Sequence, residues 1–515
     1  MNGAESLVGT LIAGGVEVCF TNPGTSEMHV VAALDRAAEV RCVLGLFEGV
    51  VTGAADGYAR MVRKPACTLL HLGPGLANGI ANLHNARRAQ VPIINIVGDH
   101  ATYHRKHDGP LTSDVEGIAK PISGWLRTSR SAQEIGLDTA EAIIAARTAP
   151  GQIATLIVAA DAAWSQGGAV GAIPALPGAS LPAHKIIERA ATTLCSGART
   201  AMVLAGDALF GRGLAAAGRI AAATGAKLLA PYPFTRIERG AGRASVERIP
   251  YVFEQAEDLL KEFRHLILVG ASIPVTYFAH PDKKASPVAE GCEIQTLASP
   301  SEDCAGAVES LAGALSRGSA ATSVQKAERP TMPSGAVTGS GIAAAIGALL
   351  PENAIVVDES MTSGRTLLPV TQGAAPHDML ANTGGSIGIA MPLAVGAAVA
   401  CPDRRVLCLS ADGSGMYTAQ ALWTMARMGL NVTTVIFANR EYAVLKREFT
   451  SFGLGEPGPR ARELFEIGRP DLDWVSLGKG MGVTGTRAAS MEEFGKALRE
   501  GFEGEGPRLI EVRLP

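Results

Sequence analysis

Two residues with oxygen-bearing side chains follow neighbouring apolar runs in the last quarter of the chain. Asp412 comes just after the run 406–410, and Asn439 ends the run 432–438. The carboxyl ends of adjacent parallel strands share one edge, where such sheets bind ligands. An Asp and an Asn suit Mg²⁺ that holds phosphate oxygens, and a helix expected to open near Met416 would favour a diphosphate there. The alternative is that Asp412 only caps this helix and Asn439 only ends a strand.

An acidic residue with apolar neighbours stands near the start of the chain. Glu48 follows Leu46 and Phe47 and precedes Val50 and Val51, where a strand gives way to a predicted helix over 48–61. A carboxyl group in such surroundings is a candidate proton donor or acceptor, because burial disfavours its charged form. The alternative is an acidic residue that the helix dipole favours in a first turn.

The elements that must position these residues are predicted to form an α/β fold. Apolar runs alternate with helix-like segments in three successive units, which predicts three consecutive doubly wound parallel-sheet domains. Their expected bounds are 1–166, 183–318 and 336–515, separated by linkers rich in Gly, Ser, Thr, Ala and Pro at 167–182 and 316–334. The predicted strands are 16–20, 40–46, 66–72, 91–97, 201–205, 227–230, 265–269, 354–358, 406–410, 432–438 and 508–512.

Composition agrees with this architecture and excludes several function classes. A chain of 515 residues points to about three domains of about 150 residues each. The net charge of −3, with no basic block, gives no reason to expect a nucleic-acid partner. The eight cysteines are scattered singly, as in reduced cytosolic proteins, and no basic leader precedes the first apolar residues, so a cytoplasmic protein is expected.

No membrane association is expected either. The uncharged window 379–402 is long enough to cross a bilayer. It contains Asn, Thr, Ser, several Gly and two Pro, and is therefore predicted to be a buried loop and helix.

Resemblance to a known family sharpens these expectations. Ala411-Asp412-Gly413-Ser414, followed by Ala438-Asn439-Arg440-Glu441-Tyr442, resembles the thiamine diphosphate (ThDP) motif of the decarboxylase and acetolactate synthase superfamily. The resemblance implies that the side chains of Asp412 and Asn439 and the backbone carbonyl of Glu441 hold Mg²⁺. It places Gly413, Ser414 and Tyr442 at the cofactor. The usual first glycine of the motif is Ala411 here, which matters little if its φ is negative.

Two further segments resemble parts of the same superfamily. The run from Leu46 to Arg60 looks like the segment of the activating glutamate, which implies that Glu48 protonates N1′ of the aminopyrimidine. The run from Ala381 to Pro392 is similar to the loop that grips this ring, where Gly385 would offer its carbonyl to the 4′-amino group and Ile387 would separate the two rings. A Gly-rich turn before a buried helix fits that run equally well. The segment with Ser360, Met361 and Thr362 would flank the diphosphate and the substrate.

The resemblance also implies an assembly. The glutamate lies in the pyrimidine-binding (Pyr) domain and the metal ligands in the diphosphate-binding (PP) domain. One subunit of this superfamily does not ordinarily bring both to one cofactor. A homodimer with shared active sites, commonly paired into a homotetramer, is therefore expected.

Within the superfamily, the benzoylformate decarboxylase branch matches over nearly the whole chain. Thr25, after Asn22-Pro23-Gly24, takes the place of a hydroxyl that holds the substrate carboxylate, and His71 falls where that branch has a catalytic histidine. A histidine that is only hydrogen-bonded in place is the alternative for His71. Leu111 stands where acetolactate synthases have Gln. The second domain shows no dinucleotide signature, so FAD is not expected.

Three further residues are predicted near the substrate with a looser match. His280 aligns only loosely with the second catalytic histidine of that branch. Leu445 and Glu448 would line the substrate pocket, and Glu448 replaces a residue that is usually aromatic. This replacement hints at a polar or cationic substrate.

The expected activity is a Mg²⁺- and ThDP-dependent, non-oxidative 2-oxo-acid decarboxylase or C–C lyase/carboligase. It would act on a small 2-oxo acid or hydroxyketone through a C2 carbanion and an enamine. An acetolactate synthase-like carboligase is the main alternative. Gly73-x-Gly75-x-x-x-Gly79 with Asp99 imitates a nicotinamide-binding fingerprint, but leaves Asp412 and Asn439 unexplained. A catalytically silent ThDP-binding subunit is a further alternative, against which the presence of Glu48 argues.

Overall fold

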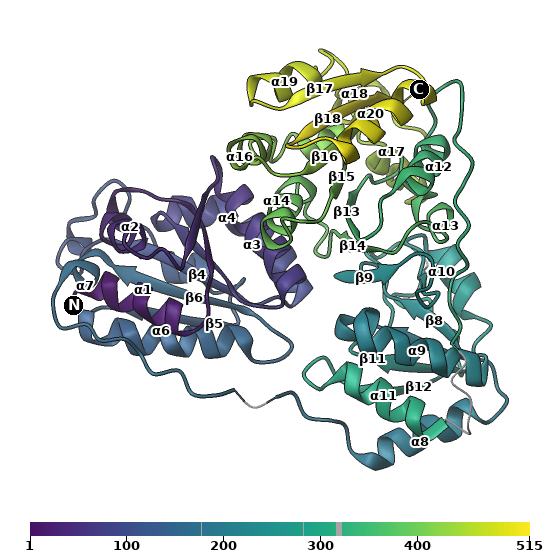
Figure 1. The fold of residues 1–515 in the computed structure, drawn as a ribbon, viewed down its shortest axis with the longest axis horizontal. Coiled ribbons are helices and arrows are strands. Elements are labelled where there is room, and N and C mark those ends of the chain that lie inside the picture. The colour runs from purple at the N-terminus through teal and green to yellow at the C-terminus, as the bar shows by residue number, and fades with distance from the viewer. Residues whose placement is uncertain (177, 282, 316–321, 515) are drawn as a thin grey trace.

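The chain folds into three sheets with helices packed against them, as seen in a computed structural model that describes residues 1–176, 178–281, 283–315 and 322–514 (Figure 1). The expected α/β class is confirmed. Residues 316–321 of the predicted second linker lie outside the described residues. The domain bounds 1–166, 183–318 and 336–515 stay a prediction. Among the described residues, no helix has both the length and the apolar character that a membrane span requires.

The first sheet has the strand order β2-β1-β3-β4-β6-β5, and all its strands are parallel. Its central strands are buried along nearly their whole length, as expected for a parallel sheet covered on both faces. The strands are β1 (Val18–Asn22), β2 (Arg41–Leu44), β3 (Ala66–Leu70), β4 (Ile93–Asp99), β5 (Trp125–Ser129) and β6 (Ile153–Ala159). The helices are α1 (Gly3–Ala13), α2 (Met28–Asp35), α3 (Glu48–Val62), α4 (Leu72–Ala89), α5 (Val115–Ala119), α6 (Ala132–Arg147) and α7 (Ala160–Trp164), with short 3₁₀ turns at Thr25–Glu27 and Arg105–His107.

The second sheet has the order β10-β8-β7-β11-β12 and is also parallel. A long segment whose described residues form no helix or strand connects it to the first unit (Figure 1). Its strands are β7 (Thr200–Leu204), β8 (Lys227–Ala230), β10 (Glu247–Arg248), β11 (His265–Val269) and β12 (Glu293–Ala298). Its helices are α8 (His184–Leu194), α9 (Gly211–Thr224), α10 (Phe253–Leu260) and α11 (Cys304–Leu315).

The third sheet has the order β17-β18-β16-β15-β13-β14-β9. Its edge strand β9 comes from the middle of the chain and pairs antiparallel with β14. The strands are β9 (Arg236–Arg239), β13 (Ala354–Glu359), β14 (His377–Ala381), β15 (Val406–Ala411), β16 (Val432–Ala438), β17 (Thr484–Ala488) and β18 (Arg508–Arg513). The helices are α12 (Gly339–Leu349), α13 (Leu367–Val370), α14 (Ala390–Ala400), α15 (Asp412–Gly415), α16 (Ala421–Met428), α17 (Ala443–Ser451), α18 (Pro459–Phe465), α19 (Trp474–Gly480) and α20 (Met491–Glu503).

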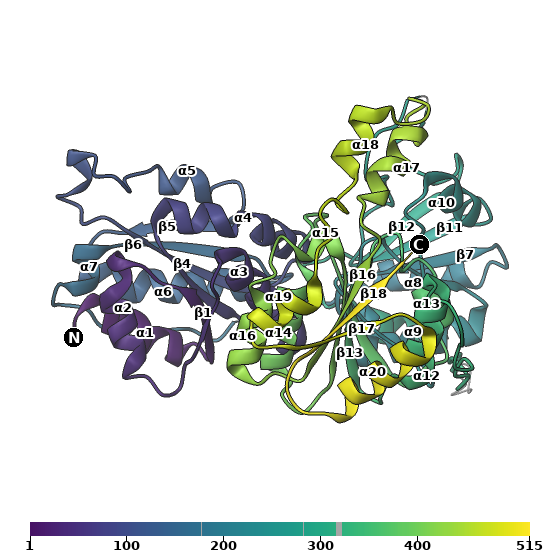
Figure 2. The ribbon, with the colours of Figure 1, turned by 90° about the horizontal axis from the view of Figure 1, so that it is seen from above.

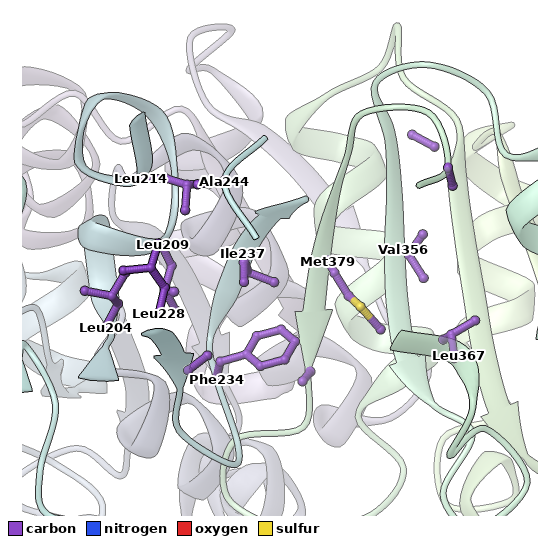
Figure 3. Packing of buried hydrophobic residues seen from close by; sticks show 14 of the residues in the cluster. Leu204, Leu209, Leu214, Leu228, Phe234, Ile237, Ala244, Val356, Leu367 and Met379 are labelled. Carbon is purple, nitrogen blue, oxygen red and sulfur yellow. The ribbon is translucent and has the colours of Figure 1, made fainter. Parts of the chain in front are cut away.

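Strand β9 joins the second and third units into one hydrophobic core. Ile237 on β9 lies between Leu204 and Leu228 of the second sheet and Met379 and Val356 of the third (Figure 3). The window 379–402 contains the end of β14, a loop and the buried helix α14, so its predicted loop and helix are present and its first residues form a strand.

Helices α3 and α14 pack closely and connect the first unit to the third (Figures 1 and 2). A Cβ atom on Gly57 would lie 2.1 Å from the carbonyl oxygen of Leu393, and one on Gly396 would lie 1.9 Å from that of Ala54. The two helix backbones therefore approach so closely that these positions have no room for a side chain.

We expect Gly57→Ala to lower the free energy of unfolding by about 1–3 kcal/mol, because the added methyl group must push the two helices apart. The melting temperature of the purified protein would measure this. Gly313→Ala in α11 is the control, since a Cβ atom there meets open space, and alanine favours a helix more than glycine does. Equal melting temperatures for the two variants would contradict the close packing.

His377, at the start of β14, is expected to make stability depend on pH. Burial lowers the pKa of this imidazole to about 4, and Arg239 opposite it contributes to the lowering. An unfolded histidine titrates near 6.5, so between these pH values the unfolded chain binds more protons than the folded chain does. Stability should therefore fall as the pH drops from about 6.5 to about 4, by an amount on the order of 3 kcal/mol from this residue.

A comparison of melting temperatures at pH 7 and pH 4.5 tests this expectation. His377→Asn should lose less stability on acidification than the wild type does, whereas the same change at the exposed His184 should have no such effect. An identical pH dependence in His377→Asn and wild type would rule out the contribution.

The main departures from the sequence-based expectations are strands that were not predicted and one misplaced helix. The strands β5, β6, β9, β10, β12, β14 and β17 were not predicted. The prediction that a helix begins near Met416 was wrong. The short helix α15 begins at Asp412, and α16 begins only at Ala421.

Candidate active site

The predicted metal ligands lie at the carboxyl ends of two adjacent parallel strands. Strand β15 leads into Asp412 and β16 into Asn439, and their register pairs Ala411 with Phe437. Asp412 is buried and accepts hydrogen bonds from the N–H groups of Gly413 (2.9 Å) and Arg440 (2.7 Å). Asn439 accepts one at Oδ1 from the Glu441 N–H (3.3 Å). The fold thus brings Asp412 beside the turn 439–441.

The donor set at this edge fits a hard cation. Burial raises the pKa of Asp412, and the N–H donors of Arg440 and Gly413 offset this only in part. A bound Mg²⁺ would compensate such a buried carboxylate. Among the described residues, no three His, Cys, Asp or Glu side chains cluster in a metal-binding arrangement, so an ion here would also need amide and backbone oxygens.

The glycine positions of the predicted motif agree with a cofactor cradle. Ala411 has φ −72°, so the missing first glycine creates no strain. Gly413 is buried, and a Cβ atom on it would lie 2.5 Å from the ring of Tyr442. Ser414 is buried beside it. The segments 411–414 and 438–442 therefore lie together where the diphosphate is expected.

The loop 382–388 lies beside the end of β13. Gly385 has φ +79° and is exposed, and Gly388 has φ +93°. Ile387 between them is half-buried, and a Cβ atom on Gly385 would lie 2.8 Å from the ring of Tyr277. The conformation of both glycines is one that other residues rarely adopt.

Residues 360–362 follow β13 directly. The Ser360 hydroxyl is buried and donates to Asp358 Oδ1 (2.5 Å). Met361 is 38% exposed with φ +52°, and Thr362 is half-buried. Ser360 is therefore already occupied by Asp358, whereas no hydrogen bond engages the Thr362 side chain among the described residues.

Glu48 begins α3 in the first unit. Its carboxylate accepts hydrogen bonds from Asn78 Nδ2 (3.0 Å) and Asn22 Nδ2 (3.4 Å), and the residue is 7% exposed. Gly75 on α4 lies beside it, since a Cβ atom there would lie 3.4 Å from Oε1. Of the glycines in the nicotinamide-like pattern, Gly75 and Gly79 thus face Glu48 and α3, whereas Gly73 faces Ser113.

His71 is the residue that precedes α4, and it lies near Glu48, since a Cβ atom on Gly75 would lie 3.3 Å from His71 Cβ and 3.4 Å from Glu48 Oε1. Its Nδ1 atom is 2.8 Å from Glu27 Oε2 and 3.2 Å from the Ser26 hydroxyl. Glu27 is 1% exposed, and its other partners are the Gly24 N–H and the Ser26 hydroxyl. The buried carboxylate orients the imidazole through Nδ1 and leaves Nε2 for proton exchange.

The remaining predicted residues of the first unit lie on exposed segments. Thr25 is exposed in the turn Thr25–Glu27, next to Gly24, where a Cβ atom would lie 2.2 Å from the His71 ring. Leu111 is 40% exposed in the loop after β4. Among the described residues, no hydrogen bond or ion pair connects Glu48, His71, Thr25 or Leu111 with the predicted ligands of the third unit.

His280 and Glu448 are brought together from different units. His280 Nε2 is 3.8 Å from Glu448 Oε2, and its ring stacks on Phe452 at a centroid distance of 4.6 Å. Glu448 on α17 also accepts from Arg447 (3.2 Å) and from Ser451 (3.2 Å). Leu445 on the same helix is 45% exposed. The Glu448 carboxylate therefore has partners within the chain, and is not a free anion facing a substrate.

Two buried carboxylates were missed by the sequence-based site. Glu27, two residues after Thr25, had no role in the predicted site, and its position three residues after Gly24 was the available signal. Glu359 ends β13 and accepts from the N–H groups of Gly388 (3.1 Å) and Ala390 (3.2 Å) and from Asn382 (3.0 Å). Burial raises the pKa of Glu359 to about 7, although the hydrogen bonds from these donors lower it. No sequence pattern indicated that it anchors the loop 382–388.

A cavity of about 910 Å³ lies elsewhere, between the first and second units. It contains none of the predicted site residues. Its polar lining includes Arg63, Arg87, Arg88, Arg147 and Arg236.

Two family models and several known proteins match this chain. Residues 1–118 match the model "Thiamine pyrophosphate enzyme, N-terminal TPP binding domain", and residues 363–512 match the corresponding C-terminal TPP binding domain. A protein of Mycobacterium tuberculosis provisionally named acetolactate synthase large subunit IlvX is 51% identical over 516 residues, which is 100% of this chain and 99% of that protein. The chain therefore belongs to the thiamine pyrophosphate, or ThDP, enzyme family.

More distant relatives belong to both branches considered from the sequence, and the acetolactate synthase large subunit of Parasynechococcus marenigrum is 25% identical over 557 residues, covering 100% of this chain and 88% of that protein. Benzoylformate decarboxylase of Pseudomonas aeruginosa is 27% identical over 526 residues, covering 97% of this chain and 96% of that enzyme. The structure of a ThDP-dependent 4-hydroxybenzoylformate decarboxylase of Rhodococcus jostii RHA1 superposes with a TM-score of 0.86 at 24% identity, over 100% of this chain and 99% of the other. This structure shows the shared fold.

Proposed function

We propose that the chain is a Mg²⁺- and ThDP-dependent, non-oxidative 2-oxo-acid decarboxylase or C–C lyase that resembles benzoylformate decarboxylase. The observation that carries this proposal is the contact of His71 with the buried Glu27 (2.8 Å), at the sheet edge that also holds Glu48. A carboxylate–imidazole pair next to a second carboxylate supplies the proton-transfer groups that a decarboxylation needs.

The residues of the third unit would hold the cofactor. Asp412, Asn439 and the Glu441 carbonyl would bind Mg²⁺, and Gly413, Ser414, Thr362 and Tyr442 would surround the diphosphate. Gly385 and Ile387 would contact the pyrimidine. When bound, ThDP supplies a carbon nucleophile that adds to the keto carbon and accepts the electron pair of the broken bond.

The residues of the first unit would move protons and hold the substrate. Glu48 would exchange a proton with N1′ of the aminopyrimidine. The Nε2 atom of His71 would give a proton to the reacting substrate, and the Thr25 hydroxyl would bind its carboxylate. His280 is a second proton-transfer candidate. Leu111, Met361 and Leu445 would form apolar parts of the pocket.

The location of these residues in two different units supports a shared active site. Glu48 and its partners belong to the first unit, and the metal ligands belong to the third. We propose a homodimer in which the first unit of one chain completes the site on the third unit of its partner, with two dimers forming a tetramer.

An acetolactate synthase-like carboligase is the second candidate. The observation in its favour is the name given to the relative that is 51% identical over the whole chain. The same proposed residues would serve this reaction, with a second carbonyl compound captured in place of a proton.

Steady-state product analysis tests the two candidates. The protein, with Mg²⁺ and ThDP added, is offered pyruvate and aryl, branched-chain and acidic 2-oxo acids, and both CO₂ and the organic product are measured. CO₂ with an aldehyde supports the decarboxylase, and CO₂ with a hydroxy-keto acid supports the carboligase. Silence across the panel with ThDP demonstrably bound would contradict both the 2-oxo-acid decarboxylase and the carboligase, and would restrict the proposal to a C–C lyase that cleaves hydroxyketones.

A further inference from the structure

The loop 382–388 is held by a helix of the first unit in the same chain. Asn85, on α4, donates from Nδ2 to the Ser386 carbonyl (2.8 Å) and accepts at Oδ1 from the Ser386 N–H (3.2 Å). His84 donates from Nε2 to the Gly384 carbonyl (3.0 Å). The peptide groups on both sides of Gly385 are thus fixed by two consecutive residues of α4.

The carbonyl of Gly385 itself is left without a donor. Among the described residues, no hydrogen bond reaches this oxygen, whereas the Gly385 N–H is bound by Asn382 Oδ1 (2.8 Å). Gly385 is exposed, so the unpaired carbonyl faces no penalty from burial. The loop therefore presents one available acceptor between two fixed neighbours.

Hydrogen bonds fix the orientation of the Asn85 side chain. It is fully buried, and its Nδ2 also donates to Asn82 Oδ1 (3.0 Å), while Asn82 donates to the Gly49 carbonyl (2.7 Å) at the start of α3. The backbone carbonyl of Asn85 accepts a hydrogen bond from the Thr383 hydroxyl (2.7 Å). A buried amide with all of its groups engaged holds one orientation, because any other would leave polar atoms unpaired.

We propose that Asn85, together with His84, is a positioning residue for the aminopyrimidine of ThDP. The pair fixes the loop so that the Gly385 carbonyl remains available to the 4′-amino group. The inference rests on the proposed function, but it assigns this task to residues of the first unit that no sequence motif had indicated.

The test compares two ligands on the full-length protein in the presence of Mg²⁺. One is ThDP, and the other is an analogue in which hydrogen replaces the 4′-amino group. Wild type should bind ThDP about tenfold more tightly than the analogue, as expected for one well-placed hydrogen bond. Asn85→Ala should lose most of this preference while its dissociation constant for the analogue changes little.

Asn95→Ala is the matched control. Asn95 is as buried as Asn85 and lies in the same unit, but its partners are Thr68 and Thr155 of the first sheet. This variant should keep the tenfold preference. If Asn85→Ala keeps it as well, or weakens both ligands equally, the positioning role is wrong.

The half-buried His84 provides a second variant should Asn85→Ala fail to fold. His84→Ala removes the hydrogen bond to Gly384 and should reduce the preference in the same direction; an unchanged preference there would overturn the proposal. A wild-type protein that binds neither ligand would instead refute the proposed function, so the two failures are distinguishable.

Discussion

Replacing Glu48 by Gln is expected to lower turnover by about 10²- to 10⁴-fold, the range that a positioned acid–base group contributes. The substitution keeps the shape of the side chain and retains one oxygen for the amide of Asn78 or Asn22. It removes the proton that the proposed mechanism transfers to the aminopyrimidine. The affinity for ThDP should therefore stay close to that of the wild type, since the diphosphate and metal ligands are untouched.

Turnover under saturating ThDP and Mg²⁺, together with a separate ThDP titration, measures both parts of this expectation. Glu17→Gln is the control, because Glu17 is a carboxylate of the same unit that pairs with Lys64 away from the site. Glu17→Gln should retain full activity. A Glu48→Gln variant with wild-type turnover would remove Glu48 from the mechanism and with it the proposed family chemistry.

Replacing Asp412 by Ala is expected to weaken Mg²⁺-dependent ThDP binding by at least about a hundredfold. Loss of a residue that only supports a metal ligand already weakens binding by about 10–100-fold, and Asp412 would itself be a ligand. The side chain also accepts from the Arg440 N–H, so its loss frees the turn 439–441 that carries the other oxygens.

Isothermal titration with ThDP at fixed Mg²⁺ would measure this effect. Asp403→Ala is the control, since Asp403 is exposed on the turn before the same strand. Asp412→Asn keeps an oxygen for one of the two N–H donors and should fold when Asp412→Ala does not. Unchanged ThDP affinity in both Asp412 variants would contradict the metal site.

The expectation of a polar or cationic substrate stays a prediction, and the partners of Glu448 argue against it. The sequence placed Glu448 in the substrate pocket, and the fold gives its carboxylate Arg447, Ser451 and His280 as partners. Neutralised in this way, Glu448 offers little attraction to a cationic substrate. Its contact with His280 indicates instead that it holds the loop of the second unit against α17.

Local sequence patterns were sufficient for the buried strands and for the residues that follow them. Short, mainly apolar runs are typical of strands buried in a parallel sheet, and 227–230, 265–269 and 432–438 were predicted with the bounds that the structure has. The strands that were missed are mostly short or partly exposed, as β10 and β17 are. Their pairing depends on neighbours distant in sequence, which a local pattern does not contain.

By itself, the sequence determined the α/β class, the family, and the positions of Glu48, His71, Asp412 and Asn439, because each of these follows from residue types within a few positions of one another. Only the tertiary structure decided which residues support them. Glu27 reaches His71 across 44 positions, Asn85 reaches Ser386 across 301, and β9 joins the third sheet at its edge. Such contacts arise when packed layers bring distant segments together and buried polar groups must find partners there.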